Sequence, residues 1–230
     1  MKEFSQLEKQ LKLKFKNQDL LKQAFVHRSY INENASFNLP HNERLEFLGD
    51  AVLELVVTEY LYNNYPNPEG ELTNWRASLV NGQMLAELAK ELNLEDYLFL
   101  SKGETKDSNG KARNYILANC FEALIGAIYL DLKYKAAEKF INQYLLPRLP
   151  HILSNELYLD PKSKFQEIAQ EKIGITPSYK VLSETGPDHN KIFEVGIYIE
   201  KKMIAKAKGS SKQEAQVNAA EAALDKKDWK

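Results

Sequence analysis

The stretch ILANCFEALIGAIY, Ile116 to Tyr129, has the apolar pattern of a buried helix, yet it carries Asn119 and Glu122 near its middle. Removing a carboxylate from water costs free energy unless the group is ion-paired, hydrogen-bonded or bound to a metal. Glu122 therefore needs a partner. An arginine such as Arg76 or Arg113 could pair with it, or a hard divalent cation could take its oxygen atoms as ligands. The stretch by itself leaves both alternatives open.

A second helical stretch, HNERLEFLGDAVLELVVTEYLY, carries an acidic stripe. At about 100° per residue, Glu43, Glu46 and Asp50 fall within roughly 60° of one another, and Glu54 extends the stripe. Most charge runs are solvated faces, but solvated helices commonly place Lys or Arg at i+4, and this stripe has none. We therefore expect its repulsion to be uncompensated. If the two helices pack together, their oxygen atoms could hold Mg²⁺.

Composition limits the class of protein. The chain has 230 residues, of which 43% are hydrophobic, so it can bury a large core. One cysteine, the absence of a signal-peptide pattern, and the absence of a long uninterrupted apolar run favour a soluble protein without a membrane partner, in a reducing compartment such as the cytoplasm. The four histidines are scattered, and Cys120 points away from Asn119 and Glu122 on helical geometry, which does not favour zinc. Cys120 is expected to be a small core residue.

The apolar period changes once along the chain. Residues 1–150 show helical spacing through Leu45–Leu61, Met84–Leu92, Ile116–Leu130 and Ala136–Leu146. Prolines then bracket a stretch taken as a linker, residues 151–160. Residues 161–228 predict a helix, three strands at Ser178–Ser183, Ile192–Ile199 and Met203–Lys208, and an alanine-rich helix. The expected fold is an all-α domain followed by a small α+β domain of order α-β-β-β-α.

The formal net charge of -1 averages two unlike parts. Residues 1–159 carry a charge of -3, whereas residues 160–230 carry +2 and contain lysine but no arginine. This modest asymmetry supports a basic binding face in the second part without requiring one.

Four motifs occur in an order that resembles the ribonuclease III family: LLKQAFVHRSY, HNERLEFLGDAVL, WRASLV and YILANCFEALIGAIYLD. The resemblance extends over essentially the whole chain, and NERLEFLGD is a highly specific signal. It implies that residues 1–150 form a helical endonuclease domain that makes a homodimer. It also implies hydrolysis of phosphodiesters in double-stranded RNA, in rRNA and mRNA processing, with Mg²⁺ or with Mn²⁺ in its place.

The same resemblance assigns roles by motif position. It implies that Glu46, Asp50 and Glu122 are direct metal ligands and that Asn119 stands at the fourth ligand position. Further site positions are auxiliary acids at Glu43 and Glu69 and a dimer-interface aromatic at Phe47, for which ordinary apolar packing is nearly the same role. His27, Arg28 and Ser29 lie in a family motif but are expected to be structural.

Asn119 departs from the family pattern, because many members have Asp there. An amide oxygen can coordinate Mg²⁺, but it supplies no formal charge and can present its NH₂ group instead. The leading hypothesis is a nuclease in which the metal activates water for in-line attack on phosphorus, leaving 5′-phosphate and 3′-hydroxyl ends with a two-nucleotide 3′ overhang. The alternative is a weakly active or non-cleaving duplex-binding protein. A phosphohydrolase of small substrates would leave the second domain without a purpose.

The second domain resembles a double-stranded-RNA-binding domain in its element order and in the segments GPDHNK and KGSSKQEAQVNAA. A-form RNA is recognised by shape, through minor-groove hydroxyls and through phosphates. The expected contacts come from the first helix, the first loop between strands and the start of the last helix: Ser163, Gln166, Glu167, Gly186, Pro187, His189 and Lys212. His189 could equally be an ordinary exposed loop residue. Gln213 and Gln216 stand where the family usually has further lysines, so phosphate affinity is expected to be lower.

Overall fold

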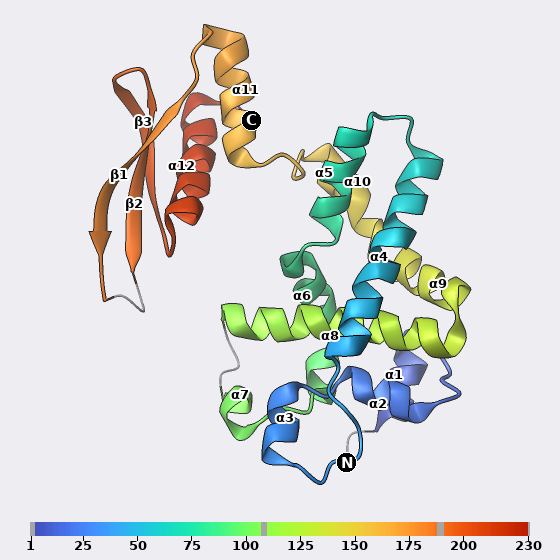
Figure 1. The fold of residues 1–230 in the computed structure, drawn as a ribbon. Helices are drawn as coiled ribbons and strands as arrows, with labels where there is room; N and C mark the ends of the chain where they lie inside the picture. The colour runs from blue at the N-terminus through green and yellow to red at the C-terminus, as the bar shows by residue number, and fades with distance from the viewer. Residues whose placement is uncertain (1–2, 107–109, 188–190, 230) are drawn as a thin grey trace. The chain divides into compact units, whose positions relative to one another are not determined.

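The protein forms two compact units in a computed structural model that describes residues 3–106, 110–187 and 191–229 (Figure 1). The first unit spans Met1–Tyr158 and the second spans Leu159–Lys230. Each unit has its own cluster of buried apolar side chains.

The first unit is helical. Within its described residues, the only strand-like pairing is one isolated bridge between Val26 and Phe99. Its helices are α1 (Phe4–Leu11), α2 (Gln18–Ala24), α3 (Arg28–Glu33), α4 (Glu43–Asn64), α5 (Glu69–Leu79), α6 (Gly82–Glu91), α7 (Lys102–Lys106), α8 (Lys111–Leu132), α9 (Tyr134–Tyr144) and α10 (Leu149–Ser154), with short 3₁₀ turns at Leu94–Tyr97 and Leu146–Arg148.

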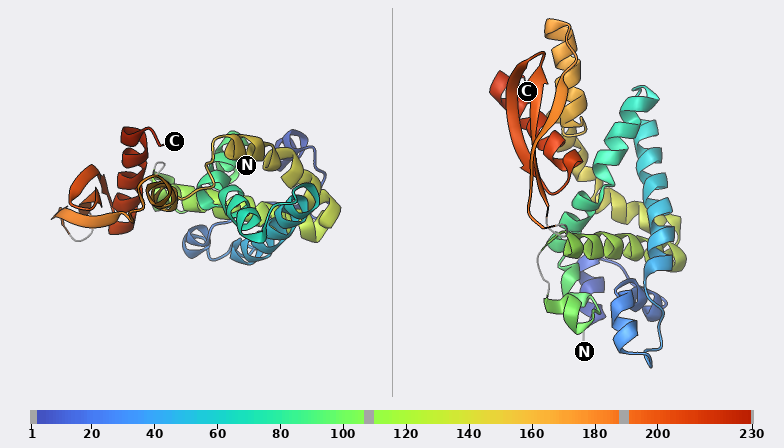
Figure 2. Two further views of the ribbon diagram at one scale, coloured as in Figure 1. Left: turned by 90° about the horizontal axis from the view of Figure 1, so that it is seen from above. Right: turned by 60° about the vertical axis from the view of Figure 1, so that its left-hand side comes forward.

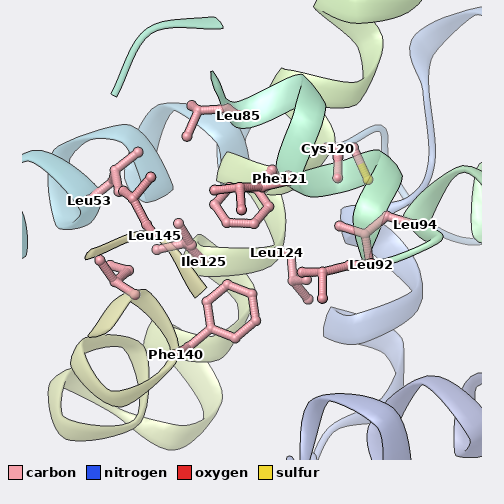
Figure 3. Close-up of a cluster of buried hydrophobic side chains, with 14 of the residues drawn as sticks. Leu53, Leu85, Leu92, Leu94, Cys120, Phe121, Leu124, Ile125, Phe140 and Leu145 are labelled. Atoms are coloured by element: carbon pink, nitrogen blue, oxygen red, sulfur yellow. The ribbon is translucent and has the colours of Figure 1, made fainter. Parts of the chain in front are cut away.

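Helix α8 is the centre of this unit. It packs against α2, α4, α6 and α9 (Figures 1 and 2). By length and composition α8 could cross a membrane, but 61% of its most apolar window is buried inside the protein, as the core helix of a globular unit would be. Figure 3 shows Phe121 and Ile125 of α8 among Leu53, Phe140 and Leu145 from the surrounding elements. Cys120 lies in the same core and is fully buried, as expected.

The motif of His27, Arg28 and Ser29, together with Asn42, orders the part of the chain that leads into α4. His27 caps α3 by accepting a hydrogen bond from the backbone N–H of Ser29, at 3.3 Å, and Ser29 Oγ accepts one from the backbone N–H of Ser101. Burial lowers the pKa of His27. Asn42, only 3% exposed, donates its side-chain amide to the carbonyl of Ala24 at 3.1 Å. The Asn42 contact holds the start of α4 against the end of α2, and the His27 and Ser29 contacts support the structural role expected for this motif.

The stretch 151–160 begins as part of the helical unit. Helix α10 covers Leu149–Ser154, Ile152 is 2% exposed, and Tyr158 packs edge-on against Trp75 of α5. Most of the expected linker therefore belongs to the first unit. The division between the two units falls after Tyr158.

The second unit has the predicted α-β-β-β-α order: α11 (Pro161–Ile173), β1 (Ser178–Thr185), β2 (Ile192–Ile199), β3 (Lys202–Gly209) and α12 (Lys212–Lys227). The strands form an antiparallel sheet in the order β1-β2-β3, with α11 and α12 on one side (Figures 1 and 2). Phe165, Ile197 and the alanine face of α12 fill the core between them. The predicted fold class is confirmed.

Candidate metal site and RNA-binding surface

A pair of glycines brings α4 and α8 into backbone contact. A Cβ atom on Gly49 would lie 1.8 Å from the carbonyl oxygen of Glu122, and one on Gly126 would lie 2.2 Å from the carbonyl oxygen of Leu45. No side chain larger than hydrogen fits at either point. Sequence reasoning considered that the two helices pack together but missed the role of these glycines, although an isolated glycine inside a strong helical pattern is itself a signal of close packing.

The junction collects the predicted ligands. Burial, and then the charges of Asp50 and Glu46, raise the pKa of Glu122 from 4.5 to about 8. Burial, followed by the charge of Glu43, also raises the pKa of Glu46, while a hydrogen bond from the side chain of Asn119 opposes that rise. The structure therefore places Glu46, Asp50, Asn119 and Glu122 within electrostatic range of one another.

The arginines considered as partners for Glu122 bind other carboxylates. Arg113 is 5% exposed and lies 3.1 Å from Glu95, measured from Nε to Oε1. Arg76 lies 3.7 Å from Glu54 and donates to Thr58 Oγ1 at 2.9 Å. In the described part of the chain, no Lys, Arg or His forms an ion pair with the clustered carboxylates Glu46, Asp50 and Glu122. The arginine alternative for Glu122 is therefore not realised.

The two ends of the acidic stripe are compensated, contrary to the expectation from α4 alone. Glu43 lies 3.5 Å from Arg28 and 3.7 Å from His41, and Glu54 pairs with Arg76. Arg28 belongs to α3 and Arg76 to α5, so i+4 spacing along α4 could not reveal these two cations. The uncompensated part of the stripe is confined to the junction with α8.

The donor set at the junction fits a hard divalent cation. Three carboxylates and one amide are all oxygen donors, which Mg²⁺ prefers. Among the described residues, no three His, Cys, Asp or Glu side chains already stand at mutual metal-binding distance. Binding a cation would thus require these side chains to converge.

Glu69 and Phe47 are not part of this cluster. Glu69 begins α5, accepts a hydrogen bond from Thr73 Oγ1, and is not among the charges that shift the pKa values of Glu46 or Glu122. Phe47 is 82% exposed on α4. With Leu55 and Tyr62 it forms an apolar stripe within roughly 80° of the helix surface.

A hollow of about 670 Å³ lies between the end of α4 and α5. Tyr62, which ends the apolar stripe, and Glu69 both contribute to its wall. Its other walls are mainly apolar and aromatic, together with Thr58, Thr73, Asn67 and Arg76.

In the second unit, the predicted RNA contacts lie on three segments. Ser163 hydrogen-bonds to Asp160 at the start of α11, and Gln166 and Glu167 are exposed on the same helix. Gly186, with φ of +95°, and Pro187 begin the connection after β1. His189 lies outside the described residues.

Lys212 begins α12 beside the end of β1. Its Nζ lies 2.9 Å from Glu184 Oε1 and 5.5 Å from the ring centroid of Phe193. Sequence reasoning selected Lys212 but missed Glu184, because the two residues meet only after the sheet and α12 pack together.

Comparisons with known proteins agree with both units. The family model described as Ribonuclease-III-like matches residues 17–149, and the Double-stranded RNA binding motif matches residues 161–227. The chain is similar to Ribonuclease 3 of Enterococcus faecalis, 42% identical over 96% of this chain and 95% of the relative. It is also similar to Ribonuclease 3 of Nitratiruptor sp., 43% identical over 97% of this chain and 96% of the relative.

Solved structures resemble the first unit. A crystal structure of the nuclease domain of ribonuclease III from Campylobacter jejuni is similar with a TM-score of 0.58 and 39% identity, covering 65% of this chain and 98% of that one. A second structure of that nuclease domain has a TM-score of 0.57 and 38% identity, covering 64% of this chain and 99% of that one. That structure is described as flexible in a region involved in dimer formation.

Proposed function

Because the chain belongs to the ribonuclease III family, we propose that the α4–α8 junction holds the divalent cation which that family requires. The chain is an endoribonuclease that acts on double-stranded RNA. Full-length relatives that are ribonucleases favour this activity over the non-cleaving alternative.

Unpaired charge at the junction is the observation that carries the proposal. Glu46, Asp50 and Glu122 would supply negative charge to the cation, and Asn119 would hold the carboxylate of Glu46 in place or offer its own amide oxygen. A cation bound there supplies Lewis-acid polarisation of the phosphoryl oxygen and promotes ionisation of water. We assign Mg²⁺ as the bound metal, because all the donors are oxygen atoms, and we expect that Mn²⁺ can replace it. The expected products carry 5′-phosphate and 3′-hydroxyl ends.

We propose that a second copy of the chain covers the apolar stripe of Phe47, Leu55 and Tyr62. Large exposed apolar side chains in line on one helix are typical of an interface. A homodimer would supply two cleavage sites, and Glu43 and Glu69, which lie outside the cluster, would act as auxiliary acids near them. The dimer-forming region described for the Campylobacter jejuni nuclease domain supports this proposal.

Duplex binding is assigned to residues 161–228 and cleavage to the helical unit, of which residues 1–150 form the main part. Ser163, Gln166 and Glu167 would contact one minor groove, and Gly186, Pro187 and His189 would contact the next. Lys212 would meet phosphate. An RNA substrate and a single cysteine favour the cytoplasm as the location.

Cleavage of a long duplex RNA in Mg²⁺, measured beside hydrolysis of a small phosphate ester, tests this function. We expect the parent to cut the duplex and to leave the ester intact. Glu122→Gln should reduce cleavage by about a thousandfold, or about 4 kcal/mol, while retaining duplex binding. Glu87→Gln, at an exposed position on α6, is the matched control and should cut normally. Unchanged cleavage by Glu122→Gln would exclude Glu122 from the site.

A further inference from the structure

Lys212 is already paired in the protein without RNA. Its ammonium group contacts Glu184 at 2.9 Å, and both side chains are substantially exposed, at 57% and 41%. Glu184 stands directly across the sheet from Phe193, whose ring Lys212 also approaches, so the cation is held by two neighbouring strands. The hydrogen bond from Lys212 lowers the pKa of Glu184. The carboxylate of Glu184 is therefore ionised at neutral pH.

A second carboxylate occupies the same end of α12. Glu214 accepts a hydrogen bond from the backbone N–H of Ser210 at 2.7 Å, and its own N–H donates to Ser211 Oγ at 3.1 Å. Unpaired N–H groups and the helix dipole make a helix N-terminus favourable for anions. At α12, carboxylates of the protein itself already take up donors that could face an RNA phosphate.

We infer that Glu184 competes with duplex RNA for Lys212 and thereby limits the affinity of the second unit. This inference rests on the proposed contact between Lys212 and phosphate. Lysine is a compact point charge on a flexible stem, so its ammonium group can exchange one oxygen partner for another. A phosphate that approaches it must either displace the carboxylate or lie beside its negative charge. Either arrangement lowers the net gain from the contact.

The consequence concerns release as well as binding. A nuclease must let go of its cut duplexes, and slow product release limits many enzymes. A carboxylate that re-forms its ion pair with Lys212 as the phosphate leaves would favour dissociation. Removing that carboxylate should therefore tighten binding.

Duplex affinity of the full chain in metal-free buffer with EDTA tests the inference without cleavage. The probe is a fluorescent RNA duplex longer than about 16 base pairs, the span of one such domain. The variants are Glu184→Gln, Lys212→Gln and the double variant. The control is Glu221→Gln, which removes the same charge as Glu184→Gln. Glu221 is exposed on α12, nine residues after Lys212.

We expect Glu184→Gln to tighten binding by about two- to fivefold, the range typical of an exposed ion pair, and to tighten it clearly less when Lys212 is already Gln. Glu221→Gln should act equally in both backgrounds. An equal gain from Glu184→Gln in both backgrounds would overturn the inference, because it would reflect general repulsion alone. Weaker binding by Glu184→Gln would also overturn it, since Glu184 would then position Lys212. Unchanged affinity in Lys212→Gln would instead remove the proposed phosphate contact on which the inference rests.

Discussion

The α4–α8 junction and the start of α12 both contain charged groups suited to RNA chemistry. The carboxylates at the junction have no cationic partner among the described residues, whereas the lysine at α12 is ion-paired. At the junction, Glu46 and Glu122 are partly buried beside the exposed Asp50, and none of the three forms an ion pair with a cationic side chain among the described residues. At α12, Lys212 is exposed and paired with Glu184.

Burial explains why the two sites suit different partners. Partly buried like charges are strongly coupled, so a proton or a cation must relieve them. Exposed pairs are screened by salt, are weak, and exchange partners easily. The junction is therefore suited to specific metal binding, and the start of α12 to adjustable, salt-dependent contact with a polyanion.

A large loss of stability is expected from closing the glycine junction. Gly49→Ala should destabilise the folded protein by about 3 kcal/mol, because the new methyl group would collide with the backbone of α8. Helix propensity alone would predict a gain of about 0.5–1 kcal/mol. Chemical denaturation measures the difference. Gly82→Ala, whose Cβ would meet Ala118 at 4.0 Å, is the control and should be nearly neutral. A neutral Gly49→Ala would mean that the helices are not in backbone contact.

Restoring a charge at the junction should give a smaller effect. Asn119→Asp adds a third negative neighbour to Glu122 and should tighten Mg²⁺ binding by about tenfold, or about 1.4 kcal/mol. Calorimetric titration of the metal-free protein measures this directly. Weaker binding by Asn119→Asp would show that the hydrogen bond from Asn119 to Glu46 matters more than charge.

The junction should also make the stability of the protein depend on pH when no metal is bound. The folded state raises the pKa of Glu122 to about 8, so it holds a proton that the unfolded chain releases near pH 4.5. The free energy of unfolding should therefore fall as pH rises from 4.5 to 8. Denaturation of the parent beside Glu122→Gln isolates this contribution, and the variant should show a flatter profile. Parallel profiles would mean that Glu122 titrates normally.

Sequence reasoning recovered the elements whose pattern is local. The three strands and the long helices α4 and α8 were predicted within a few residues because apolar periodicity reports which face is buried. The ligand candidates followed from residue types that are unusual in those patterns. Helix α10 was missed because Pro147 and Pro150 were interpreted as breaks, whereas each stands in the first turn of a helical segment, where proline is tolerated.

Contacts between distant parts of the sequence could not be predicted in this way. The pairs Arg28–Glu43, Arg76–Glu54 and Lys212–Glu184 depend on how elements pack against one another. Nothing in the spacing along one helix identifies a cation delivered by another. The same limit hid the approach of Gly49 to Glu122, which determines where the carboxylates meet.

Direct binding of Mn²⁺, followed by the loss of the free-ion electron paramagnetic resonance signal, tests the proposed metal site without relying on cleavage. The parent should bind Mn²⁺, Mg²⁺ should compete for the same site, and Glu122→Gln should lose that binding while Glu87→Gln retains it. Equal binding of Mn²⁺ by the parent and by Glu122→Gln would contradict a metal site at the α4–α8 junction.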